Sequence, residues 1–197
     1  MKQSLSTKVM LLLALALTTG MLQAQVMKII PASSSITIQG TSNLHDWKSK
    51  AEQVSGQMVL SGDNKLNSLA VEIPVNSIKS GERLMDSKTM ETFNAKKHPN
   101  ISFRMTEVSQ VQMTGTGMQV SVTGNLTMSG TTRKVTVKAN GKQLKPGTYV
   151  FNGDLALKMT DFGMKPPTAL LGAMKVGDGI KLAFDVTMVS QEQASNE

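Results

Sequence analysis

The sequence predicts an all-β, antiparallel fold with one short helix. Apolar and polar residues alternate along several runs, as they do in half-buried strands. The runs are joined mostly by short turns, and no strand–helix–strand spacing is present, which favours antiparallel pairing of about eight strands. Because each strand has one apolar face that needs a partner, either two sheets stack or one sheet closes as a barrel. The alternation alone leaves both architectures open.

The first 24 residues have the pattern of a secretory signal peptide. Lys2 and Lys8 precede the apolar run 9–17, and Leu22-Gln23-Ala24 supplies a cleavage site. The apolar run is too short to cross a bilayer as a helix, so the alternative is an amphipathic or anchoring N-terminus. We expect a signal peptide over residues 1–24, cleaved near Ala24, and a mature protein that is periplasmic or secreted.

The mature chain is predicted to form one domain over residues 25–190, followed by a polar tail over 191–197. The absence of cysteine excludes disulfides, cysteine metal sites and thiolate chemistry. The formal net charge of +7 is compatible with nucleic acid, an anionic membrane surface or an acidic ligand. The lysines are scattered and aromatic side chains are few. We therefore expect no nucleic-acid binding and at most transient contact with a membrane surface.

The strands are placed where apolar residues recur at every second position. Pro74 is expected to end its strand or to lie on an edge, because proline cannot donate to the ladder. Gly124, inside the clearest alternating run, indicates a bulge or a sharp bend. Asn140-Gly141 and Lys145-Pro146-Gly147 predict a turn region, and residues 25–31 are a lead-in without a strand. The predicted strands cover residues 34–39, 49–60, 69–75, 101–113, 118–128, 135–139, 151–159 and 180–188.

Residues 78–105 hold the clearest helix signal of the mature chain. Asp86 is suited to cap the first turn, since its carboxylate can accept from backbone N–H groups there. Met90 and Phe93 lie three residues apart and share one helical face. Pro99 ends the helix by forcing the residue before it into an extended conformation. A single apolar-faced helix among strands predicts a plug or lid on the sheet.

The strand after the helix places Ile101, Phe103 and Met105 on one face. The chain also contains 15 methionines, whose side chains are flexible and fill irregular apolar space. Such a surplus indicates either a loosely specified core or an adaptable lining for a long apolar ligand. Composition by itself favours the core.

His45-Asp46-Trp47 is the most conspicuous polar cluster. Neighbouring side chains on an extended chain point apart, so His45 and Asp46 are poorly placed to act as a base and its orienting acid. We favour a turn whose polar side chains bond backbone, with Trp47 packed on the sheet, over ligand contact and over catalysis. A metal site joining His45 and His98 to Asp46 or Asp161 has no support from the spacing.

Residues 161–172 form a connection that is apolar for a surface loop. Pro166-Pro167 fixes its backbone. The loop either caps the core or closes the mouth of a cavity, and the sequence leaves both open. Its apolar side chains are Phe162, Met164, Leu170 and Leu171.

Three ordered segments resemble the YceI-like family of exported polyisoprenoid-binding proteins. The first is Asn43-Leu-His-Asp-Trp. The second begins with Ile73-Pro-Val-Asn-Ser-Ile-Lys-Ser-Gly and continues through Leu84-Met-Asp and Met90-Glu-Thr-Phe to His98-Pro-Asn-Ile-Ser-Phe. The third is Val122-Thr-Gly-Asn-Leu-Thr-Met-Ser-Gly-Thr-Thr-Arg-Lys-Val, followed by Asp161-Phe-Gly. The resemblance covers residues 33–188, which is essentially the whole mature domain.

The resemblance implies a lipocalin-like, eight-stranded antiparallel β-barrel with one short helix and an apolar loop at the barrel mouth. It implies an interior that holds a long isoprenoid chain, with no catalysis, no metal and no cofactor. It also makes the methionines and the 161–171 loop features of a pocket, against the compositional preference.

We therefore expect an exported protein that sequesters or carries a polyisoprenoid or a similar long-chain lipid. The sequence does not decide whether the protein forms a homodimer. The alternatives are a small-substrate hydrolase or isomerase that uses His45 and Asp46, and an exported interaction domain with a filled core. The expected ligand-contacting residues, which the alternation and the family segments nominate together, are His45, Trp47, Met90, Phe93, Phe103, Met105, Phe162, Met164, Leu170 and Leu171.

Overall fold

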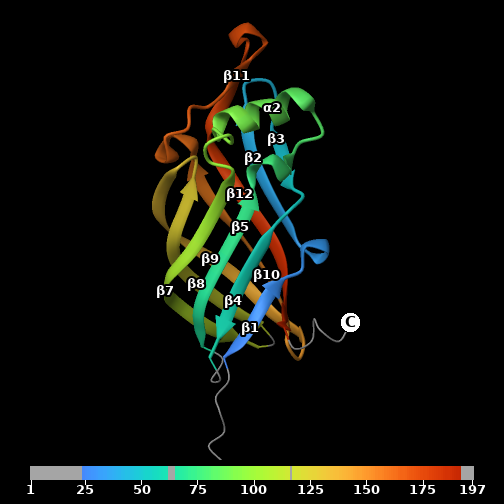
Figure 1. Cartoon of the computed structure of the whole chain (residues 1–197), viewed down its shortest axis with the longest axis vertical. Coiled ribbons are helices and arrows are strands. Elements are labelled where there is room, and N and C mark those ends of the chain that lie inside the picture. Colours follow the sequence, from blue (N-terminus) through green and yellow to red (C-terminus); the bar gives the residue numbers. More distant parts are fainter. Residues whose placement is uncertain (1–23, 62–64, 116, 192–197) are drawn as a thin grey trace, which may run out of the picture.

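Eight strands close into an antiparallel barrel in the computed structural model, which describes residues 24–61, 65–115 and 117–191 (Figure 1). The order around the ring is β1-β4-β5-β7-β8-β9-β10-β12, and β12 pairs back onto β1. The predicted fold class is therefore confirmed, and the barrel is the correct one of the two architectures. The ring strands are β1 (Gln25–Ile29), β4 (Ser55–Leu60), β5 (Leu66–Pro74), β7 (Asn100–Thr114), β8 (Gly117–Met128), β9 (Thr131–Lys145), β10 (Thr148–Lys158) and β12 (Met174–Ser190).

The last strand joins the parts of the sheet, because β12 pairs with four other strands. It lies beside β10 over residues 179–189 and beside β1 over residues 188–190. Residues 180–185 of β12 also pair with β2, which starts a branch of the sheet next to the ring. The remaining strands are β2 (Ser35–Ser42), β3 (Trp47–Ala51) and β6 (Ile78–Lys79) in this branch, and β11 (Thr168–Ala169), which pairs with the start of β12.

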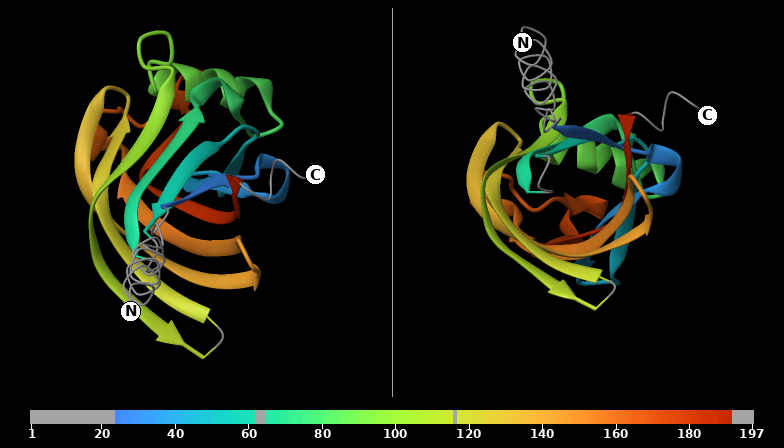
Figure 2. Two further views of the ribbon diagram at one scale, coloured as in Figure 1. Left: turned by 60° about the horizontal axis from the view of Figure 1, so that its bottom comes forward. Right: turned by 90° about the horizontal axis from the view of Figure 1, so that it is seen from below.

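The two ends of the barrel differ. One end, here called the α2 end, carries the helix α2 (Arg83–Thr92) and the hairpin of β11 with β12 (Figure 1). The opposite end carries the β9–β10 hairpin, since Thr148 pairs with Val189 whereas Thr168 pairs with Lys175. Figure 2 shows the ring of strands from further directions. Short 3₁₀ turns complete the chain: η1 (Pro31–Ser33), η2 (Val75–Ser77), η3 (Met159–Phe162) and η4 (Leu170–Gly172).

The helix begins at Arg83, so the predicted cap at Asp86 is wrong. Asp86 lies in the first turn, and its carboxylate accepts hydrogen bonds from the hydroxyl group and the N–H of Ser80, at 2.7 and 2.8 Å. Gly81, which lies between Ser80 and the helix, has a φ of 87°. This conformation turns the chain so that the donors of Ser80 reach Asp86. The two bonds, the hydroxyl first, hold the pKa of Asp86 below its ordinary value.

The ring strand that the sequence prediction missed is β1, which closes the barrel between β4 and β12. The predicted strand over residues 49–60 is also wrong, because it is two strands, β3 and β4, and the short strands β6 and β11 were not predicted. Residues 25–31 were expected to be a lead-in, yet Met27 and Ile29 are buried and Lys28 between them is exposed. The alternation is present but extends over only five residues. A strand this short becomes stable because both of its edges are paired.

β9 runs without a break from Thr131 to Lys145, so the turn predicted at Asn140-Gly141 is wrong. Gly141 pairs with Met118 of β8 and Phe151 of β10. A Cβ atom on Gly141 would lie 2.6 Å from Cε1 of Phe151, so this glycine makes room for a ring and does not turn the chain. The turn predicted at residues 145–147 is present, with a φ of 71° at Gly147.

Gly124 marks the predicted irregularity, although the register shift lies on the neighbouring strand, between Met105 and Glu107 of β7. A Cβ atom on Gly124 would lie 2.5 Å from the carbonyl oxygen of Arg104 and 2.6 Å from Cζ of Phe103. The glycine thus lets the Phe103 ring approach the backbone of β8. As predicted, β5 ends at Pro74.

The predicted signal peptide lies outside the described residues, and so does all of the predicted polar tail except Gln191. Within the described ranges, no helix combines the length and the apolar character needed to cross a membrane.

Candidate functional site

The interior of the barrel contains a cavity of about 150 Å³. All 20 residues that line it are apolar, and they come from all eight ring strands and from β2. They are Ile29, Ile36, Met58, Leu66, Leu69, Val71, Ile73, Ile101, Phe103, Val120, Val122, Leu126, Val137, Ala139, Phe151, Leu155, Leu182, Phe184, Val186 and Met188.

The lining follows from the pleat of the strands, because successive side chains point to opposite faces. In β12, for example, Leu182, Phe184 and Val186 line the cavity while Lys181 and Asp185 are exposed to solvent. Along the other ring strands, too, every second side chain points inward and is apolar, so the whole lining of the cavity is apolar. Such a surface favours apolar ligands by burial and has no charged side chain that could orient a polar one.

A second, smaller pocket of about 100 Å³ lies at the α2 end. Leu84, Met85 and Phe93 of the helix segment form one wall, and Ala169 and Met174 of the β11 hairpin contribute another. His45 and Trp47 also line it, together with Glu82 and Lys88 at its polar parts. This pocket therefore differs from the interior cavity, because it combines apolar walls with charged and hydrogen-bonding groups.

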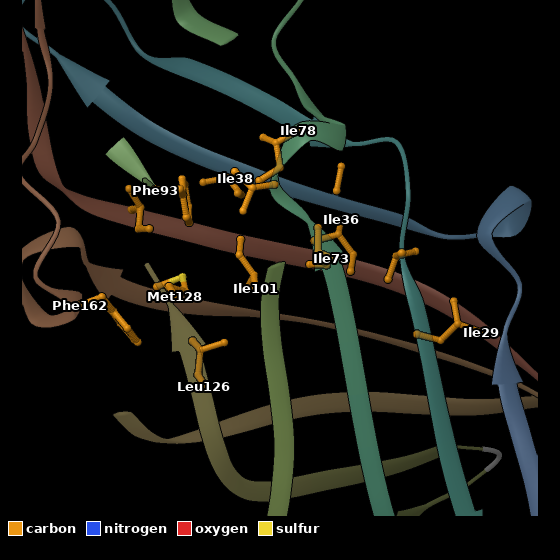
Figure 3. Packing of buried hydrophobic residues seen from close by; sticks show 14 of the residues in the cluster. Ile29, Ile36, Ile38, Ile73, Ile78, Phe93, Ile101, Leu126, Met128 and Phe162 are labelled. Carbon is orange, nitrogen blue, oxygen red and sulfur yellow. The ribbon is translucent and has the colours of Figure 1, made fainter. Parts of the chain in front are cut away.

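Buried side chains lie between residues that line the two spaces (Figure 3). Leu126 of β8 lines the interior cavity, and Met128 continues the same face of β8 toward the α2 end. Met128 and Phe162 lie between Leu126 and Phe93 and are both fully buried in the hydrophobic core (Figure 3). Met164 belongs to the same buried cluster. We call Met128, Phe162 and Met164 the core plug.

Hydrogen bonds fix the segment that carries Phe162 and Met164. The carboxylate of Asp178 accepts from the hydroxyl group of Thr160 at 2.7 Å and from its N–H at 2.9 Å. These bonds, the hydroxyl first, hold the pKa of Asp178 below its ordinary value. The Nε atom of Arg133 donates to the carbonyl oxygen of Asp161 at 2.7 Å. The turn η3 is thereby tied to β12 and β9, and Phe162 is held over the end of the barrel.

The expected site residues divide among these spaces. Phe103 lines the interior cavity, whereas His45, Trp47 and Phe93 line the second pocket. Phe162 and Met164 form part of the core plug, and Met90 is half-buried against the core. The structure thus brings six of the ten expected residues to the two spaces or to the core plug: His45, Trp47, Phe93, Phe103, Phe162 and Met164.

Four expected residues line neither space and are not part of the core plug: Met90, Met105, Leu170 and Leu171. Met105 is half-buried but lines neither space, since β7 bulges directly after it. Leu170 and Leu171 are exposed, because the hairpin reverses direction there and its tip points away from the barrel (Figure 1). The 161–172 loop therefore caps the core with its first half only.

The His45-Asp46-Trp47 cluster forms the predicted kind of turn. Nδ1 of His45 lies 2.8 Å from the main-chain oxygen of Asp46, and Nε1 of Trp47 donates to the carbonyl oxygen of Thr41 at 3.1 Å. The Trp47 ring lies against Gly40, where a Cβ atom would be 2.4 Å from it. In the described part of the chain, no group of three or more His, Cys, Asp or Glu residues is placed to hold a metal ion.

Most of the cavity lining was not named among the expected site residues. Phe151, Leu155 and Phe184, for instance, all line the interior cavity. The signal that identifies them is the same alternation that predicted their strands, once the sheet is known to close and every apolar face points inward.

Comparison with known proteins places the chain in a family. Residues 27–188 match the YceI-like domain. A UPF0312 protein of Pseudomonas aeruginosa is 36% identical over 102 residues, which are 48% of this chain and 51% of that protein. The chain thus spans about half the length of the curated relatives it matches.

Solved structures share the fold at low sequence identity. BcnA of Burkholderia cenocepacia has a TM-score of 0.66 and 21% identity, covering 81% of this chain and 98% of that one. A polyisoprenoid-binding domain of Saccharophagus degradans has a TM-score of 0.67 and 14% identity, covering 83% and 98%. The YceI protein of Campylobacter jejuni has a TM-score of 0.56 and 20% identity, covering 71% and 81%. Since the domain match extends over nearly all of the barrel, the chain belongs to the YceI-like family.

Proposed function

We propose that this protein binds a polyisoprenoid or a similar long-chain lipid inside its barrel. The observation that carries the proposal is the interior cavity, whose 20 lining residues are all apolar. Membership of the YceI-like family and the shared fold with a polyisoprenoid-binding domain of Saccharophagus degradans support it. Burial of an acyl or prenyl chain would contribute about 0.8 kcal/mol for each CH₂ group removed from water.

The open volume sets a condition on this binding. A cavity of about 150 Å³ accommodates a group of roughly the size of benzene, whereas pockets for larger ligands enclose about 300–1,000 Å³. A long chain therefore requires interior side chains to move. Six buried methionines supply the adaptable side chains: Met27, Met58, Met128, Met159, Met164 and Met188.

The part of the lipid that does not fit in the cavity would extend toward the α2 end. Met128 and Phe162 of the core plug lie between Leu126, which lines the cavity, and Phe93, which lines the second pocket, and no residue of the core plug lines either space. If Met128 and Met164 change rotamers, the two spaces join into a longer apolar channel that ends beside His45 and Trp47. A polar lipid head would then lie among the charged and hydrogen-bonding groups of the second pocket, and the apolar tail would lie in the barrel.

The proposed role is sequestration or transport outside the cytoplasm. The signal-peptide pattern of residues 1–24 supports export, and the uniform apolar lining supports holding a lipid without changing it chemically. An exported interaction domain with a filled core is the competing function, and it predicts a protein that never contains lipid.

The test is extraction of the purified protein with organic solvent, followed by mass spectrometry of the extract. We expect a lipid of isoprenoid or similar type in a stoichiometric amount, or saturable uptake of added prenol or quinone by protein that was first delipidated. Repeated absence of lipid together with no uptake of either probe would contradict the proposal and favour the filled-core domain.

A further inference from the structure

The tip of the β11 hairpin exposes two leucines in an unfavourable backbone conformation. Leu170 is 62% exposed and Leu171 is fully exposed. Three consecutive residues have positive φ, namely Leu170 at 52°, Leu171 at 55° and Gly172 at 91°. Positive φ places Cβ against the following carbonyl group, so it is unfavourable for leucine and easy only for glycine. Within the chain, nothing is gained by this arrangement, since neither side chain is buried.

Two lysines flank the tip of the hairpin, and the nearest carboxylates in the sequence, Asp161 and Asp178, lie just outside it, with Asp178 bound to Thr160. Residues 163–177 contain Lys165 and Lys175 but no aspartate or glutamate. Both lysines are exposed. Apolar side chains at the extremity are thus flanked, on both arms of the hairpin, by positive charge.

Other exposed leucines lie at the same end. Leu44 is 59% exposed, and its loop is tied to the hairpin because Asn43 donates to the carbonyl oxygen of Ala173 and accepts from the N–H of Lys175. Leu84 of α2 is 50% exposed and lines the second pocket together with hairpin residues. Of the six large hydrophobic residues exposed in the described ranges, four are therefore at the α2 end: Leu44, Leu84, Leu170 and Leu171.

We propose that the α2 end docks on the surface of an anionic lipid bilayer, with Leu170 and Leu171 inserted at the boundary between headgroups and acyl chains. Apolar side chains that enter this boundary, next to lysines that reach anionic headgroups, are the two contributions that hold peripheral proteins on membranes. A bilayer is favoured over a protein partner because Leu171 stands free of its own surface, and a fluid phase can enclose such a projection from all sides.

Docking in this orientation places the second pocket at the membrane. The pocket is lined by the same hairpin and helix that carry the exposed leucines. A lipid could then pass between bilayer and barrel without crossing water. The docking proposal goes beyond the ligand site, and it holds or fails by vesicle binding alone, whether or not the barrel contains a lipid.

The test is co-sedimentation of the mature protein with anionic vesicles made of phosphatidylethanolamine and phosphatidylglycerol. Vesicles of phosphatidylcholine, which is zwitterionic and has no net charge, are the comparison. The double variant Leu170→Ser/Leu171→Ser removes the inserted side chains. We expect its partition onto anionic vesicles to fall by about tenfold or more, given the free energy of burying a leucine side chain. Lys165→Glu/Lys175→Glu should weaken binding to the anionic vesicles only, and added salt should reduce this difference.

Leu144→Ser is the matched control. Leu144 is 59% exposed and lies between Lys142 and Lys145, but on the β9–β10 hairpin at the opposite end. This control should bind vesicles as the unmodified protein does. The docking proposal would be overturned if the unmodified protein did not bind vesicles or if the double leucine variant bound them as well as the unmodified protein. It would also be overturned if Leu144→Ser lost as much binding as the double leucine variant. Prenol uptake from solution, measured on the same variants, should stay unchanged, which separates this proposal from that of the ligand site.

Discussion

The barrel body and the α2 end are built on different principles. In the body, long strands repeat one rule, with apolar side chains inward and polar ones outward, and the result is an interior of a single chemistry. At the α2 end, short segments are held by individual hydrogen bonds between residues distant in sequence, such as Asn43 with Ala173 and Thr160 with Asp178. Under the proposed function, the body supplies the volume for an apolar ligand, and the α2 end controls which ligand enters.

The core plug joins these two regions, and its removal should have the largest effect. Phe162→Ala deletes a fully buried ring, so we expect a loss of about 3–5 kcal/mol in the free energy of unfolding, measured with urea. Phe151→Ala is the comparison within the body, because its half-buried ring already borders the open cavity. It should cost clearly less, and equal losses would show that the plug is no better packed than the cavity wall.

A pair of glycine substitutions compares how tightly the two regions are packed. Gly124→Ala would place its Cβ atom 2.5 Å from a backbone oxygen in the body, so we expect a loss of about 1–3 kcal/mol in the free energy of unfolding. Gly179→Ala, where β12 approaches the α2 end, has no atom within 4 Å of the added methyl group and should be neutral or slightly stabilising. Urea unfolding of both variants measures this contrast, which would be lost if Gly179→Ala cost as much.

The hairpin tip should gain stability from a change that weakens its proposed docking. Leu171→Gly relieves a positive φ of 55°, so we expect the free energy of unfolding to rise by up to about 1 kcal/mol. Leu144→Gly, on an exposed strand position without positive φ, should lower it instead. Thermal unfolding of the two variants gives the comparison, and a loss of stability in Leu171→Gly would refute the account of strain at the tip.

The smallest expected effect concerns pH. The pKa of Asp178 is lowered by its hydrogen bonds from Thr160, so its contribution to stability is present above the ordinary aspartate pKa of about 3.9 and is lost as the pH falls through the lowered value. Asp178→Asn should therefore show a shallower fall of the melting temperature on acidification. Asp185→Asn, an exposed position on the same strand, is the control and should follow the unmodified protein.

The contrast between the two regions also explains what the sequence could predict. Alternation identified most ring strands and hence the fold class, because a period of two is a local property of each strand. β1 was not predicted because its five residues gain stability only by pairing with two strands that are distant in the sequence. The turn predicted at Asn140-Gly141 was wrong because Gly141 makes room for the ring of Phe151.

At the α2 end the local signals were weaker guides to position. Asp86 was expected to cap the helix, but Ser80 supplies its donors after a turn at Gly81. Leu170 and Leu171 were expected to contact ligand because the family resemblance makes their loop part of the pocket, although the hairpin places them in solvent. Long-range hydrogen bonds and a reversal of the chain decide these positions, and neither has a periodic pattern in the sequence.

The claim that the barrel body holds the ligand is tested most directly by blocking its cavity. Ala139→Phe adds a ring to the cavity lining on β9, and Ala156→Phe adds the same ring to the exposed outer side of β10. Uptake of a fluorescent prenol by delipidated protein should fall at least about tenfold in Ala139→Phe, since the ring fills the space for the chain, and remain unchanged in Ala156→Phe. Both variants are first checked for cooperative thermal unfolding. Unchanged uptake in a folded Ala139→Phe protein would contradict binding inside the barrel.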